Sequence, residues 1–169
     1  MGKISKSGLG IGVGSTPQGS IAQNDFDNKI DELLEKDNIL KPLIDAKVKF
    51  NVDDVLFVTN DKSGQMVWLE KGNDDVGLNH ILRKHTDDFY EKHNVSSESI
   101  VYHIYEIITN GNIEYSRLIR RGNRDGIEKL YLFNGKFYLL TGIGVNGFIV
   151  SAYPIKEKEA IKLKARYKK

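Results

Sequence analysis

The sequence predicts an α+β domain in which N-terminal helices pack on a curved antiparallel β-sheet. Helical periodicity is found in three segments before residue 111, alternating apolar runs follow residue 111, and two Asn-Gly pairs divide those runs. Helices followed by consecutive hairpins are typical of α+β domains, and we expect the helices on one face of the sheet. The 169 residues are 40% hydrophobic and 28% charged, enough for one domain with a buried core.

The chain divides into three segments. Residues 1–20 are rich in Gly and Ser and lack the GK[ST] sequence of a phosphate loop, so we interpret them as a flexible linker, left from a longer parent protein or added for expression. Residues 21–47 form a helical segment whose apolar face is expected to pack on the domain or against a partner. Residues 48–169 form the main domain.

The first half of the main domain is expected to combine a hairpin with two helices. Two β-rich runs, 48–61 and 65–72, flank a Ser63-Gly64 turn. A helix follows over 73–93, capped near Asn73 or Asp74, and a second helix runs from a Ser96/Ser97 cap to Gly111.

The second half is expected to be an antiparallel meander of three or four strands. Its strands are predicted over 113–122, 128–135, 136–144 and 146–155. Asn134-Gly135 and Asn146-Gly147 are predicted to form hairpin turns, and Pro154 to end the last strand. Residues 156–169 are expected to form a basic helix or tail.

Composition excludes several kinds of chemistry. The chain contains no cysteine, so disulfides, thiolate metal sites and thiol nucleophiles are excluded. No apolar run approaches the roughly 18 to 20 residues that cross a bilayer, and the N-terminus lacks the apolar core of a signal peptide. We therefore expect no membrane anchor and no export signal.

Charge is distributed unevenly along the chain. Residues 21–114 carry ten Lys or Arg against nineteen Asp or Glu, whereas residues 115–169 carry thirteen against four. This asymmetry favours a cationic face for a polyanion, although a solvated basic tail explains it as well.

Three of the four histidines, His80, His85 and His93, lie within fourteen residues. His80 and Lys84 share a helical face, whereas His85 is turned by roughly 140° from His80, so both reach one small group only if the helix ends or bends nearby. The spacing of five, without an acid between, differs from the HExxH zinc pattern. A histidine on an apolar stripe is often a structural residue. A metal-dependent hydrolase, with Asp87 or Asp88 as a further ligand, remains an alternative.

The stretch VWLEKGNDDVGLNHILRKHTDDF, followed about sixty residues later by FIVSAYP, resembles the barnase/EndoU/colicin/RelE-like (BECR) group of RNase domains. The matching pattern covers Trp68 to Gly72, Gly77 to His85, and the pair Ser151 and Tyr153. The resemblance spans roughly residues 48–155. At the position of Ser151 the pattern of this group more often has Thr. Serine keeps the hydroxyl but lacks the methyl group that restricts the rotamer of threonine.

The resemblance implies the BECR-like fold and a metal-independent endoribonuclease without a cofactor, often directed at tRNA. It assigns the catalytic roles to His80, His85, Ser151 and Tyr153. It further implies a toxin domain of polymorphic or contact-dependent inhibition systems, delivered from a larger secreted protein into the cytoplasm of a target bacterium. A cognate immunity protein is expected as a partner, and the free toxin is expected to be a monomer.

The chemistry of RNA cleavage fits these residue types. Without a metal, cleavage needs a base for the 2′-hydroxyl, an acid for the leaving oxygen and donors for the phosphorane. Histidine serves as either base or acid, and Ser151 and Tyr153, two apart on a strand, project from one face toward one phosphate. The cationic candidates for substrate binding are Lys84, Arg117, Arg120 and Arg121.

Tyr115, Tyr131 and Tyr138 offer rings on which RNA bases could stack, although tyrosines are also common strand formers. The main alternative to an enzyme is a non-catalytic RNA-binding or virion-associated module that uses the same basic surface.

Overall fold

The computed structural model describes residues 17–168. The chain forms two compact units, which divide between Lys47 and Val48. The first unit contains helix α2 (Pro17–Asp45). This helix begins inside the segment expected to be a linker, and proline is well suited to a first helical position because its φ angle is already helical. The rest of the expected linker lies outside the described residues.

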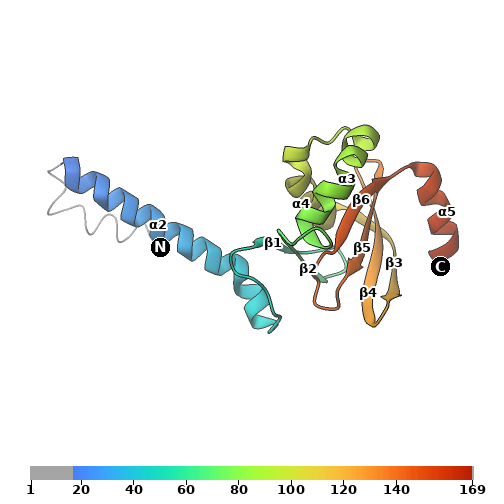
Figure 1. Ribbon diagram of the computed structural model, residues 1–169, viewed down its shortest axis with the longest axis horizontal. Helices are drawn as coiled ribbons and strands as arrows, with labels where there is room; N and C mark the ends of the chain where they lie inside the picture. The colour runs from blue at the N-terminus through green and yellow to red at the C-terminus, as the bar shows by residue number, and fades with distance from the viewer. Residues whose placement is uncertain (1–16, 169) are drawn as a thin grey trace. The chain divides into compact units, whose positions relative to one another are not determined.

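The second unit has the predicted α+β architecture (Figure 1). Its strands form two antiparallel sheets, one of order β1-β2 and one of order β3-β4-β5-β6, so the predicted meander is confirmed with four strands. In chain order its elements are β1 (Val55–Asn60), β2 (Met66–Glu70), α3 (Gly77–His93), the 3₁₀ turn η1 (Ser97–Ser99), α4 (Ile100–Asn110), β3 (Asn112–Arg121), β4 (Arg124–Phe133), β5 (Lys136–Ile143), β6 (Ser151–Ile155) and α5 (Glu157–Tyr167). The expected curvature of the sheet stays a prediction.

The two Asn-Gly pairs behave differently. Asn134 and Gly135 have φ angles of 51° and 75° and form the tight turn between β4 and β5. The second predicted hairpin turn is wrong, because β5 ends at Ile143 and β6 begins only at Ser151. The intervening loop bonds to β2 instead: the Trp68 N–H donates to the Gly147 carbonyl over 2.9 Å.

Pro154 does not end the last strand but lies within β6, opposite Tyr138 of β5. Because β6 is at the edge of the four-stranded sheet, proline there removes no hydrogen bond to a further strand.

Helices cover both faces of the four-stranded sheet, which corrects the expectation of helices on one face. Tyr131 and Leu140 pack in the core that contains α4, whereas their neighbours Leu130 and Leu139 pack in a second core with Ala160 of α5. Successive residues of a strand point to opposite faces, so α4 and α5 lie on opposite sides of the sheet. Figure 1 shows both helices beside it.

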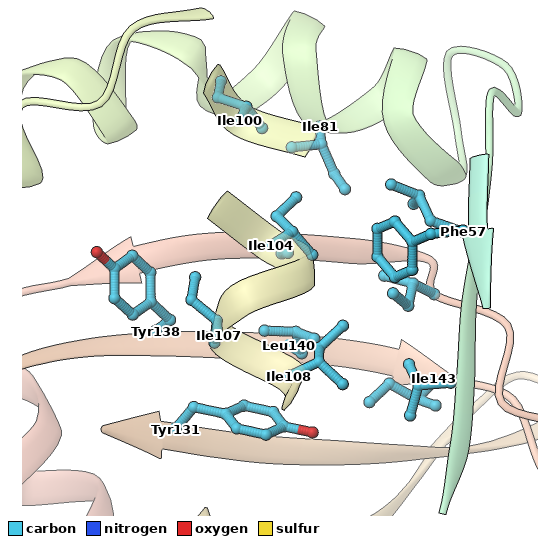
Figure 2. Close-up of a cluster of buried hydrophobic side chains, with 14 of the residues drawn as sticks. Phe57, Ile81, Ile100, Ile104, Ile107, Ile108, Tyr131, Tyr138, Leu140 and Ile143 are labelled. Carbon is cyan, nitrogen blue, oxygen red and sulfur yellow. The ribbon is translucent and has the colours of Figure 1, made fainter. Parts of the chain in front are cut away.

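Helix α4 supplies the centre of the larger core (Figure 2). Four of its isoleucines are at most 1% exposed and follow helical spacing, so they form one stripe that faces the sheet and α3: Ile100, Ile104, Ile107 and Ile108. Among the helices described, none has an apolar stretch long enough to cross a membrane.

Asp61 joins the turn of the β1-β2 hairpin to the large sheet. One carboxylate oxygen, Oδ1, accepts hydrogen bonds from the N–H groups of Ser63 and Gln65, while Oδ2 accepts from Lys129 Nζ and, over 3.1 Å, from the Tyr131 hydroxyl. Asp61 and Lys129 are 5% and 3% exposed. Burial opposes ionisation of Asp61, but the bonds from Lys129 and Ser63 outweigh it and lower its pKa.

We predict that Asp61→Asn destabilises the domain by about 3 to 5 kcal/mol, because the Lys129 ammonium is left buried without an anion. Urea unfolding measures this change. The matched control is Asp125→Asn, which breaks an exposed 3.3 Å pair with Arg120 and should cost no more than about 1 kcal/mol. Equal effects of the two substitutions would contradict the buried pairing.

Two histidines flank the buried ring of Tyr138. The ring centroid of His93 lies 4.6 Å and that of His103 5.2 Å from the tyrosine, and His103 Nε2 is 2.7 Å from its hydroxyl. Burial lowers the pKa of His93 to about 4 and also lowers that of His103. Both histidines are therefore neutral at pH 7 and contribute to the packing around Tyr138.

The folded domain should lose stability between about pH 6.5 and pH 4. In that window an unfolded histidine binds a proton, whereas folded His93, with its pKa of about 4, resists it. Acidification therefore favours the unfolded chain. We expect the free energy of unfolding to fall less between pH 7 and pH 4.5 in His93→Gln than in the wild type, by roughly 1 kcal/mol or more. Thermal melts at both values check this, and identical losses would refute it.

Candidate active site

A glycine-dependent turn fixes the start of α3 beside β6. The Gly77 N–H donates to the Val150 carbonyl over 2.9 Å, immediately before β6 begins. Gly77 has a φ of 79°, and a Cβ there would lie 2.8 Å from the Glu70 carbonyl oxygen, so only glycine fits. Asn73, expected as a cap, instead accepts from the N–H groups of Asp75 and Val76 and shapes the turn before the helix.

This attachment brings three of the four predicted catalytic residues near one another. The His85 ring stacks on that of Tyr153, with centroids 4.6 Å apart and planes inclined by 22°. The His80 and His85 centroids are 5.9 Å apart. Both histidines lie inside α3, and their rings nevertheless approach each other edge to face.

The proton positions of both imidazoles follow from their partners. His80 Nδ1 lies 2.9 Å from the Asp74 carbonyl oxygen, which only accepts, so this nitrogen carries the proton. His85 Nδ1 lies 3.1 Å from Asp88 Oδ2. Burial opposes ionisation of Asp88, but the bonds from His85 and Lys92 outweigh it and lower its pKa, so the carboxylate is ionised and accepts as well. In the neutral form of each ring, Nε2 is therefore the basic nitrogen.

His85 is neutral at pH 7. Burial lowers its pKa below the ordinary value of 6.5; Asp88 acts in the opposite direction, and the charge of His80 lowers it again. A neutral imidazole backed by a carboxylate is equipped to accept a proton and to stabilise the imidazolium that forms.

The register of the large sheet places the remaining polar candidates on the face of Tyr153. Between β5 and β6, Leu139 pairs with Tyr153 and Thr141 with Ser151. Between β3 and β4, Arg117 pairs with Glu128. Paired residues share a face, and Leu130, two residues after Glu128, pairs with Leu139. One face thus carries a row of polar side chains across four strands: Ser151, Thr141, Glu128 and Arg117.

Ser151 shares this face but is closed off. It is 4% exposed, and its hydroxyl has no hydrogen-bond partner among the described residues. A buried hydroxyl of this kind is uncommon in native proteins. It can reach a phosphate only after neighbouring side chains move, whereas Tyr153 and His85 are partly exposed.

Arg117 is held within the domain. Its Nε donates to Glu128 Oε1 over 2.8 Å, the Tyr115 hydroxyl donates to the same oxygen, and the guanidinium lies 4.0 Å from the centre of the Tyr167 ring. Burial opposes its charge, but Glu128 outweighs this and raises the pKa of Arg117. Glu128 therefore neutralises a residue that we expected to contact RNA.

The other cationic candidates lie apart from Arg117. Arg120 projects to the opposite face of β3 and pairs with Asp125, so it does not share one surface with Arg117. The backbone of Arg121 ends β3, but its side chain lies outside the described part of the structure. Lys84 is exposed on α3, one turn after His80.

The expected aromatic platform is wrong. Tyr115, Tyr131 and Tyr138 are 5%, 0% and 1% exposed, so none offers a ring face to a base. All three alternate into the two cores of the sheet, in agreement with the simpler interpretation that they are strand formers.

Sequence reasoning missed two carboxylates that organise the site. The sequence suggests Asp88 only as a metal ligand, although its position three residues after His85 on a helix is a signal for contact. Glu128 is opposite Arg117 in a hairpin whose loop is Gly122 and Asn123, so recognition of that two-residue turn would have paired them. Among the residues described, no group of three or more His, Asp or Glu is arranged to hold a metal ion.

Comparisons with known proteins add no further guide to the site. No family model matches the chain, and no curated protein matches its sequence.

We predict that Asp88→Asn lowers the pKa of His85 further. The substitution removes the negative charge that favours the imidazolium, while the positive charge of Lys92 remains nearby. An NMR titration of the His85 ring measures the change. Asp87→Asn is the matched control, because Asp87 is the exposed neighbour of Asp88 and does not contribute to the pKa of His85. A larger shift in the control would contradict the assignment.

Proposed function

We propose that this protein is a metal-independent endoribonuclease. The proposal is carried by one observation: two imidazoles lie 5.9 Å apart with each Nδ1 held by an oxygen acceptor, which leaves both Nε2 atoms for proton transfer. The hydroxyl-bearing ring of Tyr153 stacks against one of them. A base, an acid and a hydrogen-bond donor are the groups required to cleave RNA through its own 2′-hydroxyl.

His85 is the general base in this proposal. Its lowered pKa keeps it neutral, so Nε2 takes the proton of the 2′-hydroxyl while Asp88 holds Nδ1–H and stabilises the imidazolium. The 2′-oxygen attacks phosphorus and the bond from phosphorus to the 5′-oxygen breaks. Protonated His80 gives its Nε2 proton to that leaving oxygen. The products are a 2′,3′-cyclic phosphate and a 5′-hydroxyl.

Tyr153 and Lys84 are proposed to stabilise the charge that develops on the phosphate. The tyrosine hydroxyl donates a hydrogen bond, and the lysine ammonium supplies a point charge from the helix that carries both histidines. Arg117 takes no direct part, since Glu128 neutralises it. Ser151 joins the site only if substrate binding opens the packing above it.

The biological setting proposed is that of a toxin delivered from a larger secreted protein, with tRNA as the substrate in a target cell. The cationic C-terminal third, with thirteen Lys or Arg against four acids, favours a polyanionic substrate. An acidic immunity protein would bind the same charge pattern rapidly and in a salt-sensitive manner.

We expect purified protein to cleave total tRNA in EDTA, and His85→Ala to cleave it about 10²- to 10⁴-fold more slowly while still binding it, because the base is lost. Mapping the RNA ends checks rate, position and end chemistry together. Tyr90→Ala is the control, since Tyr90 is 62% exposed on the same helix and outside the proposed site. Binding without cleavage by the wild-type protein would instead favour a non-catalytic RNA-binding module.

A further inference from the structure

A hollow of about 460 Å³ opens on the main domain, and its lining differs from that of the proposed catalytic site. The rings of Trp68 and Phe148 contribute to its wall, with centroids 5.1 Å apart in an edge-to-face arrangement. Three glycines in the lining, Gly126, Gly142 and Gly144, present backbone in place of side chains. We call this hollow the Phe148 pocket.

The Phe148 pocket adjoins the row of polar residues on the sheet. Ile119 and Gly126, which line it, pair with each other across β3 and β4. Ile119 lies two residues after Arg117 on β3, and Gly126 lies two residues before Glu128 on β4. The pair Ile119–Gly126 is therefore on the same face as the pair Arg117–Glu128 and adjacent to it along the strands.

The other side of the Phe148 pocket reaches the elements that carry the catalytic residues. Val150 lines the pocket and directly precedes Ser151 in the chain. Val76 also lines it and is the N-cap of α3, one helical turn before His80. The pocket therefore adjoins the starts of the two elements that carry the proposed catalytic residues, α3 and β6.

The polar groups of the lining suit a base better than a phosphate. Glu70 supplies a carboxylate, which repels an anion, whereas Lys49, Arg124 and the Asn146 amide supply donors. A nucleobase edge presents both donors and acceptors, and its flat face stacks on aromatic rings. The indole N–H of Trp68 is already bonded to the Asn146 carbonyl and the residue is 1% exposed, so Trp68 packs against the Phe148 ring and Phe148 is the aromatic residue that a ligand can reach.

We propose that the Phe148 pocket binds one nucleobase of the RNA, next to the scissile phosphodiester, with its face against the Phe148 ring. This inference rests on the proposed ribonuclease function and extends it with a base-binding subsite. The nucleotide on one side of the cut is then selected by the pocket, and the histidines act on the bond beside it.

Binding can be measured without cleavage. The four 2′-deoxy dinucleotides with identical bases lack the attacking hydroxyl and serve as probes, with titration calorimetry for affinity. Trp68 is the single tryptophan of the chain and lines the pocket, so its fluorescence reports where the probe binds. We expect at least one dinucleotide to bind saturably and to change that fluorescence.

Phe148→Leu should raise the dissociation constant about 10-fold, since it removes the aromatic ring on which the base stacks. Val145→Ala is the matched control, because Val145 is 81% exposed on the same loop. A second pair of variants tests the same pocket in case Phe148→Leu does not fold. Ile119→Glu adds a negative charge inside the pocket and should weaken binding, whereas Leu118→Glu adds it at a 76% exposed position on the opposite face and should not.

The outcomes separate this inference from the function on which it rests. If the enzyme cleaves RNA in a His85-dependent way but dinucleotide affinity is the same in wild type, Phe148→Leu and Ile119→Glu, the base-binding pocket is overturned and the ribonuclease stands. If dinucleotides bind in a Phe148-dependent way and no RNA is cleaved, the pocket stands as a nucleotide site and the catalytic proposal fails.

Discussion

The candidate site depends on the attachment of the loop between β5 and β6 to strand β2. Trp68 makes three hydrogen bonds to this loop: its backbone N–H donates to Gly147, its carbonyl accepts from Ile149, and its indole N–H donates to Asn146. These bonds fix where β6 begins. Because the N–H of Gly77 is bonded to the residue just before β6, they also fix where α3 begins, and the stacking of His85 on Tyr153 follows.

Much of this architecture is readable from local sequence. The helical stripe of α4, the Asn134-Gly135 turn and the four strands follow from periodicity and turn chemistry, which act over a few residues. Asn146-Gly147 misled the prediction because a partner nearly eighty residues earlier in the chain, Trp68, takes the backbone bonds that a hairpin would use. Pairings at that separation leave no local signal.

The site was predictable in residue type more than in geometry. His80, His85 and Tyr153 lie near one another, as the proposal requires, but periodicity alone does not show that Ser151 is sealed or that Arg117 is neutralised. Both depend on which side chains from other strands and from α5 cover the sheet. A count of cationic residues in a sequence therefore overstates the charge available to a ligand, since a buried acid such as Glu128 holds the charge of Arg117 within the domain.

The arginines of β3 have a consequence for solubility. Strand β3 is an edge of the four-stranded sheet, and an edge strand is a template for pairing with another copy of the protein. Arg117 and Arg120 project to opposite faces of this edge, and each is paired with an acid of β4, Glu128 and Asp125. Long charged side chains thus flank both faces of the edge, and a second copy that paired there would have to displace these ion pairs, which disfavours association whether or not the domain ever meets RNA.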